Sequence, residues 1–368
     1  MKVLRFIKKN IVFCIAAFAA LITCFLVPPD REYLDYFDWK TLSCLFLTLA
    51  VVCALRNIRF FTIVSRKLVV MAGNLRTLFL LLIIITFIGS MIIANDMALI
   101  TFLPLGYFAL SVTKQEKYMA YLFVLQNISA NLGGMLTPFG NPQNLYLYSY
   151  FSIPTVEFCR IMFPPFLIAV SLLMLACIPV KPKKFVLDEE FGEKLHIKKT
   201  ILYIFLFFLS ILIVFRVIPF GLGLLFIPVV LFFVDRDALK KVDYGLLGTF
   251  FFFFIFAGNL ARLEVVNTLI SSLLQKDTLI VSVLSCQFIS NVPSAILLSK
   301  FTGDYASLLL GVNIGGTGTL IASLASLITF SEFRSLYPEK TKKYIGIFAA
   351  ANAVFLIVLT VAAKILNF

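Results

Sequence analysis

Apolar residues run along this chain in long blocks that are separated by short polar loops. Uninterrupted blocks of a length typical of membrane-crossing helices lie at 11–27, 41–55, 161–179, 200–217, 221–234, 244–258 and 344–363. Two further blocks, 118–150 and 305–331, are equally apolar but are interrupted by glycine, proline and amide side chains. The pattern predicts nine spans and an all-α polytopic membrane protein.

The first interruption, 131–144, reads N-L-G-G-M-L-T-P-F-G-N-P-Q-N. Two glycines together and two prolines do not continue as an α-helix, so the span must break there. The second interruption, 313–323, reads N-I-G-G-T-G-T-L-I-A-S and repeats the N-x-G-G-x-x-T core at the same spacing. Unwound backbone survives at membrane depth only where it is buried in protein or lines a cavity, and matched breaks in two halves indicate a transporter built from repeats.

A polar pair or cluster also interrupts two paired apolar runs. In the first pair, 77–112, the interruption is Asn95-Asp96; in the second, 277–300, it is S-N-V-P-S at 290–294. The first pair could cross the membrane twice, or it could form a re-entrant hairpin with its tip at mid-membrane. We favour the hairpin because the polar pair has no loop-like neighbours, and because an intramembrane carboxylate is a candidate functional group. An N-cap role for Asp96 is compatible with the hairpin.

Composition and charge support a membrane protein and set its orientation. The chain is 61% hydrophobic and 14% charged, and its net charge is +13. Of the 32 Lys and Arg residues, 24 fall in loops on one side of the nine-span arrangement, which places the N-terminus in the cytoplasm. The basic residues thus report topology, and nucleic-acid binding is not expected. We interpret Met1 and the basic residues after it as the start of a retained first span rather than a signal peptide.

Other basic residues predict one further helix, and the cysteine and histidine content argues against a zinc site. Arg56, Arg59, Arg66 and Lys67 punctuate apolar residues over 56–69, which predicts a basic amphipathic helix on the inner membrane surface. The seven cysteines are scattered and the single histidine, His196, lies in a charged loop, so a zinc site is excluded. Without a Ser/His, Asp/Asp or H-E-x-x-H pairing, the chain is not expected to be an enzyme.

These elements divide the chain into four parts. Residues 1–40 form a first span and an outer loop, 41–180 a first repeat, 181–243 a cytoplasmic loop with two linking spans, and 244–368 a second repeat. The first hairpin opens to the inside and the second to the outside. We therefore expect two repeats of inverted topology around a site near the membrane midplane.

The chemistry of the two tips and two breaks predicts this site. Helix N-termini there attract an anion and helix C-termini attract a cation, glycines let a ligand approach the backbone, and amide and hydroxyl oxygens suit a hard cation such as Na⁺. Because the motifs contain no Lys or Arg, the anion must be held by dipoles, amides and a co-bound cation. The candidate site residues are Asn95, Asp96, Asn131, Gly133, Gly134, Thr137, Gly140, Asn141, Asn144, Ser290, Asn291, Pro293, Ser294, Asn313, Gly315, Gly316, Thr317, Thr319 and Ser323.

Each of these features also has a purely structural interpretation. Glycines in membrane helices are often packing contacts, and a lone asparagine often joins two helices. A membrane scaffold or receptor without transport activity would need no more than that. The duplicated core at matched spacing, preceded in each half by a polar tip, favours function over packing.

Four motifs resemble those of the ion transporter superfamily, which holds the citrate, divalent-anion/sodium, arsenite and related sodium/proton antiporter families. They are N-D-x-A-L at 95–99, the first break, Q-F-I-S-N-V-P-S-A-I-L-L at 287–298 and V-N-I-G-G-T-G-T-L-I-A-S-L-A at 312–325. The likeness extends from about residue 40 to the end and is greatest to bacterial inner-membrane, citrate-transporter-like anion permeases. The tips here read A-N-D and S-N-V, where the dicarboxylate branch carries S-N-T.

The resemblance implies an architecture and a mechanism. It implies a homodimer with a scaffold and a mobile elevator domain, and Na⁺ sites near Asn95 with Asn131 and near Asn291 with Asn313. The sequence thus predicts a secondary transporter of a small organic or inorganic anion, coupled to Na⁺ or H⁺, in a bacterial inner membrane. A Na⁺/H⁺ antiporter that uses Asp96 is the alternative.

Overall fold

The computed structural model describes residues 11–184 and 195–366. Within these ranges the chain forms α-helices and short 3-10 helices, with one isolated bridge between Asn74 and Lys184. This confirms the predicted all-α class. The basic start of the chain and the centre of the long basic loop, 185–194, lie outside the described residues.

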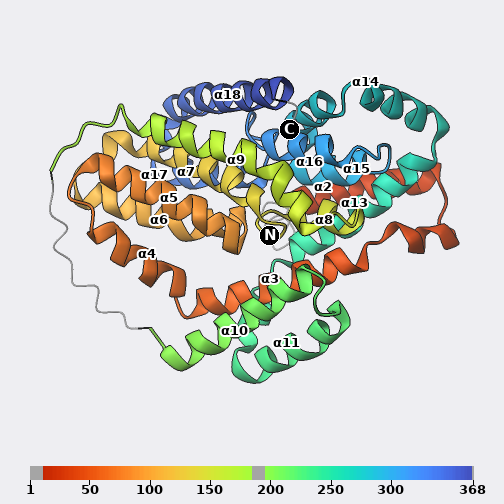
Figure 1. The fold of residues 1–368 in the computed structure, drawn as a ribbon, viewed down its shortest axis with the longest axis horizontal. Helices are drawn as coiled ribbons and strands as arrows, with labels where there is room; N and C mark the ends of the chain where they lie inside the picture. Colours follow the sequence, from red (N-terminus) through yellow and green to blue (C-terminus); the bar gives the residue numbers. More distant parts are fainter. Residues whose placement is uncertain (1–10, 185–194, 367–368) are drawn as a thin grey trace.

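The first half of the chain contains eight α-helices and the second half contains nine in the described residues (Figure 1). Those of the first half are α2 (Ile11–Leu26), α3 (Trp39–Asn57), α4 (Phe60–Val70), α5 (Leu75–Ile93), α6 (Asn95–Val112), α7 (Met119–Gly133), α8 (Pro142–Tyr150) and α9 (Thr155–Cys177). Those of the second half are α10 (Ile197–Val214), α11 (Phe220–Val234), α12 (Arg236–Lys240), α13 (Tyr244–Arg262), α14 (Glu264–Ile289), α15 (Asn291–Leu298), α16 (Tyr305–Ile314), α17 (Leu324–Leu336) and α18 (Thr341–Ile365). The 3-10 helices are η1 (Arg31–Tyr36), η2 (Glu116–Tyr118), η3 (Gly134–Leu136) and η4 (Pro338–Lys340).

Eight of the described helical segments are long and apolar enough to cross a membrane. They include α5 and α6, the arms of the first predicted hairpin, but not the broken spans, whose pieces are too short to cross alone. The chain is therefore a multi-pass membrane protein.

Polar side chains at loop ends set where many of these helices begin. Asp38 accepts a hydrogen bond from the backbone of Thr41, and Asp304 accepts one from Ser307, each capping the first turn of its helix. Asn74 and Asp243 do the same at the starts of α5 and α13. Each cap satisfies an N–H group that the helix leaves unbonded, and such a cap contributes about 1 kcal/mol.

The helices pack in two groups. In one, α2 packs against α13, and α10 and α11 pack against α3. In the other, α5, α6, α7, α9, α17 and α18 form one end, and α14, α15 and α16 form the other. Contacts of α3 with α8 and of α13 with α15 join the groups. Figure 1 shows α5 and α6 in its left half and α14 and α15 in its right half, with α3, α10 and α11 along the lower edge.

Each hairpin turns at a single residue with the same unusual backbone conformation. Ala94 has φ 66° and ψ 153°, and Ser290 has φ 74° and ψ 159°. Positive φ is uncommon for residues with a Cβ, so its recurrence at both tips marks them as related structures. Asn95 and Asp96 belong to the first turn of α6, and Asp96 does not cap it: the side chain of Asn95 accepts the hydrogen bond from the Asp96 N–H.

The second hairpin differs from the first in length. Residue Asp277 interrupts α14 with φ −167° and ψ 91°, which separates residues 264–276 from the first arm of the hairpin. The second arm, α15, has only eight residues, against 18 in α6. Asp277 caps the arm through the Ile280 N–H and forms an ion pair of 2.5 Å with Lys364 of α18.

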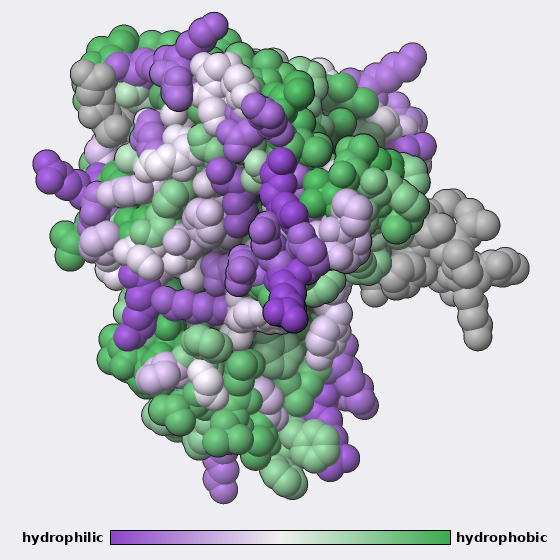
Figure 2. Space-filling view, turned by 90° about the vertical axis from the view of Figure 1, so that its right-hand side faces the viewer, coloured by the Kyte–Doolittle hydropathy of each residue, from purple (hydrophilic) through white to green (hydrophobic). Residues whose placement is uncertain are grey.

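The outer surface is consistent with a membrane environment around a polar centre. Figure 2 views the end of the molecule that lies at the right of Figure 1: hydrophilic residues gather in the middle, and hydrophobic residues lie above and below them. Many large apolar side chains of α10 and α11 are exposed, among them Phe205, Leu225 and Phe233. Exposure of this kind suits contact with lipid.

Candidate functional site

The two breaks meet in the protein interior through asparagine side chains. Asn313, in the last turn of α16, donates a hydrogen bond of 2.6 Å to Oδ1 of Asn144, in the first turn of α8. Asn141 donates to Oδ1 of Asn313 at 3.3 Å and to the backbone carbonyl of Asn131 at 3.2 Å. All four side chains are buried. The structure thus brings together residues that lie about half the chain apart in sequence.

Each hairpin tip lies against the break that follows it. Asn95 donates a hydrogen bond of 3.2 Å to Oδ1 of Asn131 in the first half. In the second half the N–H of Asn291 donates to the carbonyl of Ala322 at 2.9 Å, and the hydroxyl of Ser290 donates to the same carbonyl at 3.3 Å. The first tip is therefore linked through hydrogen bonds to both breaks, and the second tip is linked to the far end of the second break.

A matched threonine ties each break to its hairpin. Thr137 donates to the carbonyl of Met91 at 2.8 Å, and Thr319 donates to the carbonyl of Gln287 at 3.0 Å. Each acceptor lies three residues before the tip, and each threonine is the last residue of its N-x-G-G-x-x-T core. The repeated sequence core thus corresponds to a repeated hydrogen bond.

The helix ends at this site present both kinds of backbone charge. Four helices begin at or beside the tips and breaks, namely α6, α8, α15 and α17. Four others end there, namely α5, α7, α14 and α16. Free N–H groups at the former favour an anion, and free carbonyls at the latter favour a cation. The arrangement has the elements for binding both.

Several buried polar atoms at the site make no hydrogen bond to any described residue. They are Oδ1 of Asp96, Nδ2 of Asn131, Oδ1 of Asn141 and Oε1 of Gln143. Buried polar groups are normally hydrogen-bonded, so these atoms keep donor and acceptor capacity that a bound solute would use. Three are oxygens, the ligand type that a hard cation prefers, and one is a donor that an anion accepts from.

Some predicted site residues bond locally instead. The hydroxyl of Ser294 contacts that of Ser285 at 2.8 Å within the second hairpin, and Thr317 bonds to the carbonyl of Ile314. Ser323 caps α17 through the Ser326 N–H. These side chains shape the hairpin and the break.

Other predicted residues act through close packing. A Cβ at Gly133 or Gly315 would lie within 3 Å of a neighbouring helix, and Gly140 lies against the carbonyl of Gly134. A Cβ at Gly316 would lie 3.0 Å from the side-chain nitrogen of Asn291. Pro293 is buried in the first turn of α15.

The site also contains residues that the sequence analysis did not select. Gln287 donates to the carbonyl of Gly315 at 2.9 Å and accepts from the N–H of Thr319, so it holds the second break in shape. Asn127 donates to the hydroxyl of Ser326 and links the two halves again. Gln287 is the first residue of the motif at 287–298. An amide side chain in an apolar run was the sequence signal that could have identified it as a site residue.

The fold is that of a multi-pass membrane protein, and comparisons with known proteins identify its family as one of transporters. The family model described as "Citrate transporter" matches residues 3–307. An uncharacterized transporter of Methanocaldococcus jannaschii is 34% identical over 301 residues, which are 81% of this chain and 82% of the relative. The chain therefore belongs to the citrate transporter family, as the motifs predicted.

Two further relatives agree with this assignment. The inner membrane protein YbiR of Escherichia coli strain K12 is 26% identical over 315 residues, or 83% of this chain and 82% of that protein. The silicon efflux transporter LSI3 of Oryza sativa subsp. japonica is 29% identical over 160 residues, or 43% of this chain and 32% of that protein.

Proposed function

We propose that this protein is a secondary active transporter of a small organic or inorganic anion, coupled to Na⁺ or H⁺. The observation that carries the proposal is the buried contact of the two breaks, Asn313 with Asn144 at 2.6 Å, beside buried polar atoms without partners. Helix N-termini there suit the anion, and unpartnered oxygens suit the coupling ion.

The coupling ion fits the residues at the first tip and break. Oδ1 of Asp96 and Oδ1 of Asn141 are buried and have no hydrogen-bond partner among the described residues, and Asn95 bonds directly to Asn131. We propose this group for one Na⁺ and the group of Asn291 with Asn313 for a second. When bound, Na⁺ supplies positive charge that helps to hold the anion in a site whose motifs contain no Lys or Arg.

We propose that the two halves are inverted repeats and that the first hairpin is re-entrant. The tip of this hairpin contacts Asn131 at the end of α7. The broken span then continues as α8, whose nine residues extend it by about 13 Å. Figure 1 supports opposed hairpins, because the two lie in opposite halves of the molecule. In this arrangement α2, α3, α10, α11 and α13 form the scaffold, and the hairpins with the broken spans form the elevator domain.

Location and assembly follow from the same proposal. The relative YbiR is named an inner membrane protein, and the charge distribution favours a cytoplasmic N-terminus. We propose a bacterial inner-membrane location with the basic loops inside. The exposed apolar face of α10 and α11 suits both lipid and the second subunit of a homodimer.

A Na⁺/H⁺ antiporter is the second candidate, because Asp96 is a half-buried carboxylate within an apolar helix and its Oδ1 is buried without a hydrogen-bond partner among the described residues. Proteoliposomes separate the two. Uptake of labelled anion, driven by a Na⁺ or pH gradient, supports the symporter; Na⁺/H⁺ exchange with no anion requirement supports the antiporter. Thermal stabilisation of the purified protein by citrate, succinate, sulfate, phosphate or arsenite, with and without Na⁺, narrows the solute.

A further inference from the structure

The first broken span packs against α10 and α13 through aromatic side chains. The ring of Phe139, in the first break, has its centroid 6.4 Å from that of Phe207 and 6.0 Å from that of Phe215, both at the C-terminal end of α10. Further along the span, the ring of Tyr146 in α8 lies 5.6 Å from that of Phe254 in α13. An element of the proposed elevator domain thus lies directly on helices of the proposed scaffold, and apolar surfaces of this kind separate without leaving polar groups unpaired.

One arginine adds a polar contact to this apolar surface. Arg216 lies in the short loop between α10 and α11, and its Nη2 donates a hydrogen bond to the backbone carbonyl of Tyr148, in the last turn of α8. Its guanidinium carbon also lies 4.4 Å from the centroid of the Tyr148 ring, which is a cation–π contact. The C-terminus of a helix carries partial negative charge, so a cation is favoured there. Arg216 therefore joins the scaffold to the first broken span by interactions that a relative movement has to break.

The backbone at Arg216 favours glycine over arginine. Helix α10 ends with hydrogen bonds from the Arg216 N–H to the Ile213 carbonyl at 3.0 Å and from the Val217 N–H to the Leu212 carbonyl at 2.9 Å, the pattern of a Schellman motif. Arg216 takes the position with φ 63°, where glycine is usual because a Cβ is unfavourable. Glycine has no side chain that reaches Tyr148. The contact between the two domains is therefore what an arginine provides at this position.

Lys114 provides a comparison within the same chain. It follows α6 with φ 53°, and its N–H donates to the Ser111 carbonyl at 3.1 Å while the Gln115 N–H donates to the Leu110 carbonyl at 2.8 Å. The backbone of Lys114 thus matches that of Arg216, but Lys114 is exposed whereas Arg216 is half-buried. Lys114 is therefore the matched reference for any change made at Arg216.

Release of Arg216 would leave the end of α8 intact. The Tyr148 carbonyl also accepts a hydrogen bond of 3.2 Å from the Ile153 N–H, and the Tyr148 hydroxyl bonds to that of Thr155 at 2.6 Å. Nε of Arg216 is buried and has no hydrogen-bond partner among the described residues, so the guanidinium uses only part of its donor capacity. A contact of this kind breaks and re-forms without unfolding either domain.

We propose that Arg216 is a latch that holds the first broken span against the scaffold and releases when the elevator domain moves. The latch is closed in the conformation described here. Its purpose rests on the proposed transport function, whereas the contact itself does not. Loss of the Arg216 side chain should therefore destabilise this conformation relative to the other end of the movement and raise the population of the second one.

The distance between scaffold and elevator domain tests the latch. Spin labels are attached at Gly221 of α11 and at Gly303 in the loop after α15, where an added Cβ meets nothing within 4 Å, in a background without the seven native cysteines. Electron paramagnetic resonance then measures the label separation in nanodiscs. In Arg216→Gln we expect the ratio of the second population to the first to rise about tenfold, the value of one hydrogen bond to a charged group. Arg216→Lys keeps the cation and should restore part of the wild-type ratio.

Two glycine variants separate the latch from the backbone strain. Arg216→Gly removes the side chain and relaxes the positive φ, whereas Lys114→Gly relaxes the same φ away from this contact. The latch requires a changed distance distribution in Arg216→Gly and an unchanged one in Lys114→Gly. A wild-type distribution in both Arg216→Gln and Arg216→Gly, in protein that size-exclusion chromatography shows to be folded, would overturn it. A changed distribution in a protein that carries no anion flux would support the latch and count against the transport function alone.

Discussion

The side chain of Asn313 donates a hydrogen bond of 2.6 Å to that of Asn144, 169 residues earlier in the chain. Both residues are buried, and each lies in the helical turn next to its break. A second amide, Asn141, binds Asn313 and the backbone of Asn131. Side-chain hydrogen bonds therefore set the relative position of the two breaks, and changes in those amides should alter the site before they alter the fold.

Replacing Asn313 by alanine tests this relationship. The change removes the donor to Asn144 and leaves the buried oxygen of Asn144 and the amide of Asn141 each without that partner, at a cost of about 1–3 kcal/mol. We expect anion flux in proteoliposomes to be abolished while the protein remains folded in detergent. Size-exclusion chromatography and thermal unfolding report the folded state.

The matched control is Asn267→Ala. Asn267 is an exposed amide of α14 that bonds to the carbonyl of Ala261, far from the breaks along the chain. Its loss should leave flux unchanged. Retained flux in Asn313→Ala would show that the contact between the two breaks is not needed for transport.

The tips and breaks could be predicted from the sequence alone, because each contains residues that interrupt a helix within an apolar block. Glycine pairs and prolines indicated the unwound segments, and the repeated N-x-G-G-x-x-T core placed Thr137 and Thr319 at matching positions. Which atoms bond was beyond prediction, since the Asn313 to Asn144 contact depends on how two distant halves pack. The helical boundaries also shifted: Asn131 and Asn144 lie inside helical turns, so the unwound stretch is shorter than 131–144.

The paired threonines give a second prediction. Thr137→Val and Thr319→Val keep the shape of the side chain but remove the donor to the carbonyls of Met91 and Gln287. We expect each change to lower the rate of flux severalfold, because the break loses its tie to the hairpin that precedes it. Serine retains the hydroxyl, so Thr137→Ser and Thr319→Ser should restore most of the activity. A strong effect in one half and none in the other would contradict the equivalence of the two halves.

Close packing at the first break gives a third prediction. A Cβ at Gly134 would lie 2.3 Å from Oδ1 of Asn141 and 2.7 Å from the carbonyl of Gly140, closer than real contacts allow. Gly134→Ala should therefore displace Asn141 and abolish ligand-induced thermal stabilisation. At Gly221 of α11 a Cβ would meet nothing within 4 Å, so Gly221→Ala is the control and should bind as the wild type does. Unchanged ligand binding in Gly134→Ala would show that the position of Asn141 does not matter.

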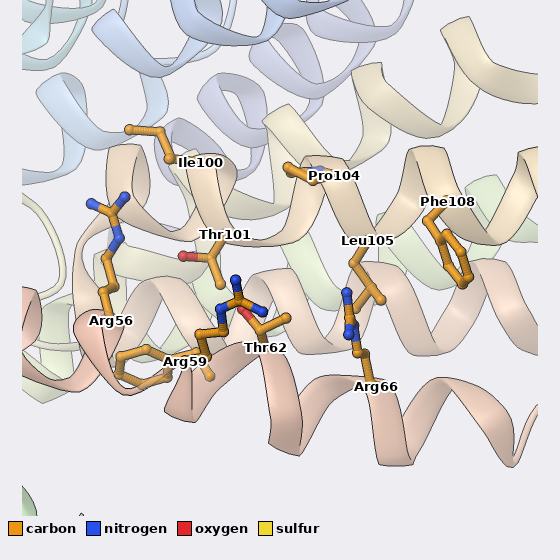
Figure 3. A pocket seen from close by; sticks show the side chains of 10 residues that line it. Arg56, Arg59, Thr62, Arg66, Ile100, Thr101, Pro104, Leu105 and Phe108 are labelled. Carbon is orange, nitrogen blue, oxygen red and sulfur yellow. The ribbon is translucent and has the colours of Figure 1, made fainter. Parts of the chain in front are cut away.

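A cavity of about 280 Å³ lined by Arg56, Arg59 and Arg66 is a feature that the sequence could not show (Figure 3). Arg56, Arg59 and Arg66 were read as the polar face of a helix on the membrane surface, which their spacing alone supports. The positive φ of Arg59 turns that face inward against α6. A single backbone angle at a non-glycine residue carries no sequence signal, so the cavity became visible only in three dimensions.

The last prediction concerns the identity of the coupling ion, which we expect to bind at Asp96. This is the only carboxylate in the two tips and two breaks, and its buried Oδ1 has no hydrogen-bond partner among the described residues. A carboxylate oxygen that is buried without a hydrogen-bond donor favours binding of a proton or a cation, so H⁺ and Na⁺ should compete for it. We expect added Na⁺ to shift the pH dependence of wild-type flux between about pH 5 and pH 8, and Asp96→Asn to remove that shift.

Asp30, in the loop before η1, provides the control for this pH experiment. The hydrogen bond from Arg262 holds the pKa of Asp30 below its usual 3.8. A depressed pKa means that the ion pair contributes above the unfolded pKa and is lost only as the pH falls through the lower folded value. Between about pH 5 and pH 8 Asp30 stays ionised, so Asp30→Asn should leave the Na⁺-dependent pH shift intact. If Asp96→Asn also left it intact, the coupling ion would have to bind elsewhere, and the second group around Asn291 and Asn313 would be the next place to test.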